Sequence, residues 1–170
     1  MQSIGEAYIK RTYDEIRKWL KNRATDGPIG VSFSGGIDSG SIFLLTYHAM
    51  LEMGLSPSRL KAFTLSIEGK GDDAIQAREF LKAVNLEMFL ETIEIPASGI
   101  DWQETIRIVE DYKALDLEAA TMNHALLKAV RERYPDWKWM LDGDGGDENL
   151  KDYPIEETPE LTIRSVLNNL

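Results

Sequence analysis

The sequence predicts an α/β fold in which a parallel, twisted sheet carries helices on both faces. Three observations lead to this fold: short apolar runs suited to buried strands, helical stretches that separate them, and glycine-rich loops after two of them. Strands that alternate with helices are joined by crossovers, which keep the strands parallel and place helices on either face. We therefore expect four strands, with a ligand site off their carboxyl ends.

Each element follows from a local pattern. Apolar residues recur at helical spacing from Ile4 to Leu20, which predicts an amphipathic helix ending in the turn at 22–27. Pro28 starts the first strand, over 29–33, and a helix is expected over 39–53. The later elements alternate in the same way: strand 60–67, helix 72–84, strand 87–95, helices at about 101–111 and 118–133, and strand 137–141.

Composition limits the classes of function. A chain of 170 residues with 43% hydrophobic content suits one domain over 1–170, and it has no apolar run long enough for a membrane span and no signal-peptide pattern. A cytoplasmic location is the expectation that follows. The net charge of −10 argues against nucleic acid as a partner, and the lack of cysteine excludes thiolate chemistry and Cys metal sites within this chain.

The first glycine-rich loop, Ser34-Gly-Gly-Ile-Asp-Ser39, directly follows the first strand. Adjacent glycines let backbone approach a ligand, serine hydroxyls donate hydrogen bonds, and the next helix would point free N–H groups at an anion. Asp38 would repel phosphates unless a cation lay between them, so it indicates a magnesium-bound nucleotide. A tight turn with an Asp-Ser helix cap is the alternative interpretation.

The second loop, Asp142-Gly-Asp-Gly-Gly-Asp-Glu148, places four carboxylates and three glycines in seven residues after the last predicted strand. It predicts a magnesium and nucleotide loop facing the first one. Two alternatives stay open. A calcium loop would need its third acid one position earlier, and an acidic surface turn would use the same residue types.

The first loop resembles the Ser-Gly-Gly-x-Asp-Ser signature of the pyrophosphatase-loop ATP enzymes, which split ATP between its α and β phosphates. With the second loop, the chain resembles the synthetase domain of asparagine synthetases and β-lactam synthetases, whose motif reads Ser-Gly-Glu-Gly-Ala-Asp-Glu. Segments 26–36 and 61–69 and the triplet Ala-Arg-Glu at 77–79 also match that family. NAD and GMP synthetases share only the first motif. The resemblance implies an adenine nucleotide α-hydrolase-like, Rossmann-like fold.

The resemblance also implies roles for individual residues. Those expected to hold the pyrophosphate portion of ATP are Ser34, Gly35, Gly36 and Ser39. Backbone around Ser32, Leu65 and Gly143 is expected to hold the adenosine. Asp38 and Asp147 would coordinate Mg²⁺, and Asp144 stands where the family has the Glu proposed to accept a proton from the attacking amine.

The chain departs from the family at several points. Asp144 is one methylene shorter than Glu, Asp142 replaces a serine, and the Phe-Gly-Gly-Tyr continuation becomes Asn-Leu-Lys-Asp-Tyr at 149–153. The family's catalytic Lys and a fifth strand lie further downstream than Leu170, and its glutaminase domain with an N-terminal Cys is not in this sequence. Either the chain is a fragment, or a partner completes the site, or catalysis here is partial.

The function implied is that of an ATP-dependent, AMP- and pyrophosphate-forming amide ligase of the asparagine synthetase type. It would use ATP and Mg²⁺ to adenylylate a small-molecule carboxylate for attack by an amine or ammonia. A glutaminase is one expected partner, and the protein could form an oligomer. Two alternatives remain open: another ATP-pyrophosphatase ligase using free ammonia or an internal amine, and a non-catalytic nucleotide-binding or assembly module.

Overall fold

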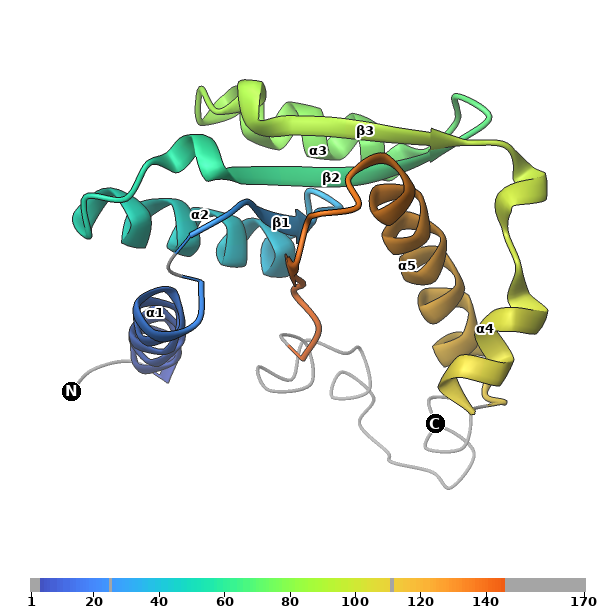
Figure 1. The fold of residues 1–170 in the computed structure, drawn as a ribbon, viewed down its shortest axis with the longest axis horizontal. Helices are drawn as coiled ribbons and strands as arrows, with labels where there is room; N and C mark the ends of the chain where they lie inside the picture. The colour runs from blue at the N-terminus through green and yellow to red at the C-terminus, as the bar shows by residue number, and fades with distance from the viewer. Residues whose placement is uncertain (1–3, 25, 111, 146–170) are drawn as a thin grey trace, which may run out of the picture.

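The computed structural model describes residues 4–24, 26–110 and 112–145. Helices and strands alternate along this part of the chain (Figure 1). The helices are α1 (Ile4–Asn22), α2 (Ile37–Glu52), α3 (Asp72–Ala83), α4 (Trp102–Val109) and α5 (Ala114–Arg133). The strands are β1 (Ile29–Ser32), β2 (Leu60–Ile67), β3 (Leu90–Ile95) and β4 (Trp139–Leu141).

The strands form one parallel sheet with the order β3-β2-β1-β4, which confirms the predicted fold class. The chain moves outward from β1 to β2 and β3, and then returns through α4 and α5 to place β4 on the other side of β1. The strand order therefore reverses between β1 and β4. In open α/β sheets, ligands bind off the carboxyl ends of the strands at such a reversal, and both glycine-rich loops begin there.

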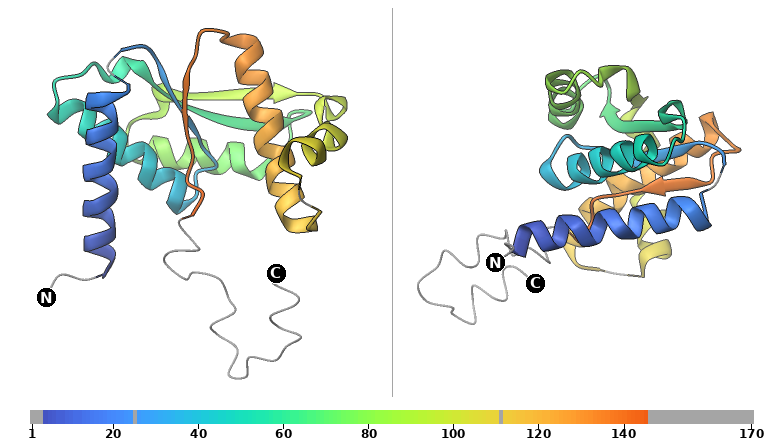
Figure 2. Two further views of the ribbon diagram at one scale, coloured as in Figure 1. Left: turned by 60° about the horizontal axis from the view of Figure 1, so that its bottom comes forward. Right: turned by 90° about the vertical axis from the view of Figure 1, so that its left-hand side faces the viewer.

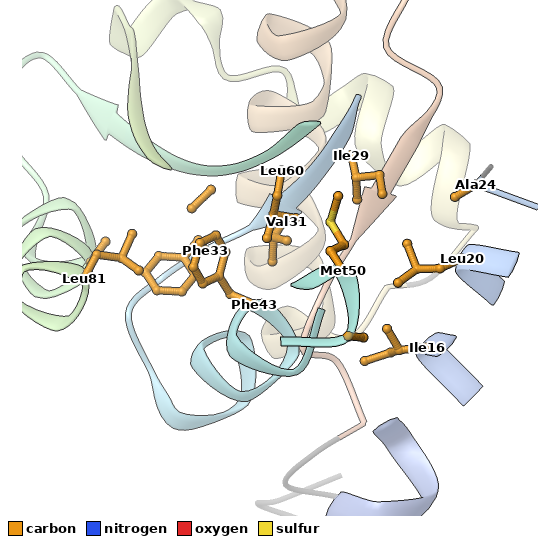
Figure 3. Close-up of a cluster of buried hydrophobic side chains, with 13 residues drawn as sticks. Ile16, Leu20, Ala24, Ile29, Val31, Phe33, Phe43, Met50, Leu60 and Leu81 are labelled. Atoms are coloured by element: carbon orange, nitrogen blue, oxygen red, sulfur yellow. The ribbon is translucent and has the colours of Figure 1, made fainter. Parts of the chain in front are cut away.

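One face of the sheet packs against α1, α2 and α3. Side chains from these helices and from β1 and β2 form its core (Figure 3). Phe33, directly after β1, packs edge-on against Phe43 of α2 at a ring-centroid distance of 5.6 Å. The other face packs against α5 through a second cluster that includes Phe63, Ile93 and Leu126. Helices thus cover both faces, as the sequence predicts.

Helix α1 runs beside the edge strand β4 (Figure 2). The rings of Trp19 and Trp139 meet edge-on with centroids 5.5 Å apart. Among the described residues, no helix has both the length and the apolar character that crossing a membrane requires.

A charged cluster fixes the C-terminal end of α5 to the start of β3. The Glu91 carboxylate accepts hydrogen bonds from Lys61 Nζ at 2.5 Å and from Tyr134 Oη at 2.7 Å, and Arg133 Nε lies 3.3 Å away. Burial opposes ionisation of Glu91, but these partners outweigh it and hold the pKa of Glu91 below its usual value. The cluster lies near the start of the strands, far from the glycine-rich loops.

Several element boundaries differ from the predicted ones. Residues 87–89 form a 3-10 turn rather than the start of β3, and β4 begins at Trp139 rather than at Trp137. Helix α5 begins four residues before the predicted start at 118. Helix α4 starts after Asp101, whose carboxylate accepts a hydrogen bond from Glu104 N at 2.9 Å as an N-cap. The prediction of one domain over 1–170 extends beyond the described residues and stays a prediction.

Candidate nucleotide-binding site

The loop between β1 and α2 has the backbone of an anion site. Helix α2 begins at Ile37, and its N-cap residue Gly36 has no side chain with which to cap the first N–H groups. The helix is 16 residues long, so its aligned peptide dipoles favour negative charge at this end. The arrangement suits the phosphates of a nucleotide.

Gly35 brings this loop against α3. Its φ is +82°, and an ideal Cβ built on it would lie 2.5 Å from the backbone N of Ala77. The side chain of Gln76 adds a direct tie, because its Nε2 donates a hydrogen bond to Gly35 O at 3.1 Å. Only glycine satisfies both the backbone angle and the contact. Sequence reasoning assigned no role to Gln76, since a contact across 41 residues has no local signal.

The two predicted phosphate-binding serines lie together. Ser34 Oγ and Ser39 Oγ are 3.1 Å apart, and Ser34 Oγ accepts a hydrogen bond from Gly36 N at 3.2 Å. Ser39 Oγ also lies 3.3 Å from Ser34 N and 3.4 Å from Gly36 O. The hydroxyls bond within the loop at the long end of the normal range, so a phosphate oxygen could replace these bonds at little cost.

The second loop reaches the first at Gly143. An ideal Cβ on Gly143 would lie 2.6 Å from Ser39 N and 3.0 Å from the Asp38 Cβ. No real Cβ fits at that distance, so glycine allows the chain after β4 to lie against the first turn of α2. Asp38 is half-buried beside this contact, and Asp144 is exposed on the second loop. The contact unites two motifs that are more than 100 residues apart in the chain.

The remaining predicted contacts lie at the same edge of the sheet. Ser32 ends β1, and its Oγ donates a hydrogen bond to Oδ1 of Asn123 on α5 at 3.3 Å. Leu65, in the second half of β2, is half-buried and packs with the cluster under α5. Asn123 is a second residue that the sequence interpretation did not single out.

The predicted metal pair can be placed only in part. Asp38 is at the start of α2, whereas Asp147 lies outside the described residues, so their separation stays untested. In the part of the chain that the structure describes, no group of three or more acidic or histidine side chains gathers as metal ligands. The variant continuation at 149–153 also lies outside the described residues.

Comparison with known proteins finds a matching family and related sequences. The family model for asparagine synthase matches residues 13–167. An asparagine synthetase [glutamine-hydrolyzing] of Lotus japonicus is 31% identical over 143 residues, which cover 79% of this chain and 23% of that protein. The root asparagine synthetase [glutamine-hydrolyzing] of Pisum sativum is 29% identical over 163 residues, or 86% of this chain and 26% of that protein.

The fold and the paired loops define a parallel α/β domain in which two glycine-rich loops meet at the carboxyl edge of the sheet. The chain belongs to the asparagine synthase family, since the family model spans most of it. It spans about a quarter of the length of the curated relatives that it matches.

Proposed function

We propose that this chain forms the ATP-binding part of an amide ligase that activates a carboxylate as an acyl-adenylate and releases pyrophosphate. The observation that carries the proposal is the contact of Gly143 with the first turn of α2, because it brings both family motifs to one site. Membership of a family whose named relatives are asparagine synthetases supports the same chemistry.

The residues suit a nucleotide with Mg²⁺. The start of α2 and the Ser34 and Ser39 hydroxyls would hold the pyrophosphate portion, while backbone at Ser32, Leu65 and Gly143 would flank the adenosine. A magnesium ion would screen the phosphates from Asp38, with Asp147 as the second proposed ligand. These groups would bind and orient ATP, and positioning is a large part of what such a site contributes to rate.

Asp144 is proposed as the base that accepts a proton from the attacking nitrogen. It is exposed, and it follows directly after Gly143, next to the point where the two loops meet. A carboxylate at that place could stabilise the ammonium that forms as the amine attacks. The nitrogen source would be ammonia or an amine, supplied in glutamine-dependent relatives from glutamine. A cytoplasmic location and a glutaminase partner remain part of the proposal.

ATP–pyrophosphate exchange across a panel of amino-acid carboxylates tests the proposal. We expect exchange with at least one carboxylate, loss of exchange in Asp38→Ala, and retained exchange without amide formation in Asp144→Ala. A different ligase of the same superfamily would also exchange, but its amide product would identify another nitrogen donor. Binding of ATP with exchange at background for every carboxylate would instead indicate a non-catalytic nucleotide-binding module and contradict the ligase assignment.

A further inference from the structure

The side chain of Asn123 lies where α5 passes the carboxyl edge of the sheet. At its C-terminal end, α5 is fixed near the start of β3, where Arg133 reaches Glu91. Ten residues earlier, Asn123 meets Ser32, the last residue of β1. The helix therefore runs back along the sheet, and its residues before Asn123 extend past the edge at which the glycine-rich loops begin.

Ser32 faces α5 rather than α2. Alternate residues of a strand point to opposite faces, and Ile29 and Val31 belong to the core shared with α2. Gly30 lies on the other face, where an ideal Cβ would come within 3.0 Å of the Phe63 ring in the cluster under α5. Leu65 packs with that same cluster. The adenosine contacts proposed at Ser32 and Leu65 thus share one side of the sheet with Asn123.

We infer that the carboxamide of Asn123 recognises the adenine base of the bound nucleotide. This inference rests on the proposed function, since it names the residue that would select ATP at the same site. A carboxamide offers a donor and an acceptor side by side, as adenine does with its exocyclic amino group and the neighbouring ring nitrogen. Guanine carries a carbonyl oxygen in place of that amino group, so a carboxamide held in place pairs less well with it.

Ser32 acts as the positioning residue for this carboxamide. The Ser32 hydroxyl donates to Asn123 Oδ1, which holds the carboxamide with its oxygen toward Ser32 and leaves the second lone pair of that oxygen and the amide hydrogens for a ligand. The Asn123 carboxamide is half-buried, and the described residues offer it only the bond with Ser32, so its amide hydrogens can serve a ligand. A purely structural tie between α5 and β1 would use the same bond, but it would affect stability without affecting the choice of nucleotide.

The test measures Kd for ATP and for GTP, each with Mg²⁺, by displacement of a fluorescent ATP analogue from the full chain. We expect the parent to prefer ATP. Asn123→Leu should weaken ATP binding at least about fivefold, leave GTP binding nearly unchanged, and so reduce the preference by that factor. Asn123→Asp offers acceptors only, which match the N–H groups of guanine, and should shift the preference toward GTP.

Two controls separate base recognition from other effects. Met122→Leu changes the exposed neighbour on α5 and should leave the ATP-to-GTP ratio as in the parent. Ser34→Ala should weaken both nucleotides equally, because phosphates are common to them. If Asn123→Leu and Asn123→Asp both keep the parent's ratio, the inference is wrong and the proposed function stands. If the parent binds neither nucleotide, both fail together.

Discussion

Gly143 lies so close to Ser39 that a Cβ on the glycine would stand 2.6 Å from the serine's backbone nitrogen. This contact joins the loop after β4 to the first turn of α2 across the point where strand order reverses. We expect Gly143→Ala to push the two loops apart at a cost of about 1–3 kcal/mol. Affinity for ATP with Mg²⁺, measured by calorimetry, should fall about tenfold.

Gly5→Ala is the matched control for that substitution. Gly5 lies in α1, and a Cβ there meets no atom within 4 Å. The change should raise helix stability slightly and leave ATP affinity unaltered. Equal ATP affinity in Gly143→Ala and the parent would show that the contact has no part in nucleotide binding.

Adjacent glycines in the first loop should differ in their tolerance of a side chain. Gly35 has a positive φ, and a Cβ at this position would clash with the α3 backbone. We therefore expect Gly35→Ala to lose roughly 2 kcal/mol or more in unfolding free energy. Gly36 has a φ of −72°, and its Cβ would meet only the Ser34 Oγ at 3.3 Å. Urea unfolding should therefore find Gly36→Ala much the milder change. A reversed order would contradict the packing of Gly35 on Ala77.

The cluster around Glu91 predicts a pH-dependent stability. Its folded-state pKa lies below the usual 4.5, so its contribution is present above about that pH and is lost as pH falls through the folded value. The partner Lys61 limits this stabilisation at high pH. Burial lowers the pKa of Lys61, but the interaction with Glu91 outweighs burial and raises that pKa above 10.5. The contribution of Lys61 to stability is therefore lost only in strong alkali. Glu91→Gln should cost on the order of 1–3 kcal/mol at pH 7.

Chemical unfolding of the parent and Glu91→Gln at pH 7 and at an acidic pH below the folded-state pKa of Glu91 checks this expectation. The difference between the two proteins should shrink as the pH falls through the folded-state pKa of Glu91, since the parent's carboxylate then becomes protonated in the folded state as well. A difference that is the same at both pH values would mean that charge on Glu91 contributes nothing.

Replacement of the buried Thr64 side chain should stabilise the folded protein. Its side chain is 1% exposed, and Oγ1 has no hydrogen-bond partner among the described residues. Thr64→Val removes that buried hydroxyl while keeping the shape, so we expect a gain of about 1 kcal/mol in unfolding free energy. Thr46 is the matched control, because it is equally buried but donates to Ile42 O at 2.7 Å. Thermal melting should show that Thr46→Val is less stable than the parent. A loss of stability in Thr64→Val would contradict the expectation, because it would indicate a hydrogen-bond partner for the Thr64 hydroxyl.

Local patterns predicted the elements and one part of the site. Strand β2 was predicted at its observed bounds because an apolar run between a Pro break and a Gly turn has few other interpretations. Gly35, Ser39 and Gly143 could be singled out because a motif carries its own spacing, and their roles in binding stay predictions.

Two contacts beside the candidate site could not be predicted in this way. Gln76 and Asn123 reach the loop and β1 from helices 41 and 91 residues away, and only the sheet order brings them there. Helix α5 packs against α4, and such tertiary packing can override the weak local propensity from which its later start was predicted. The role of Asp147 stays a prediction, because that residue lies outside the described part of the chain.

Hydrogen–deuterium exchange with and without ATP and Mg²⁺ tests the central claim most directly, because it reports on both loops at once. If the two loops hold one nucleotide, amides at 34–39 and at 142–145 should gain protection together, over the same range of ATP concentration. Protection of the first loop alone, or of neither, would contradict a shared site.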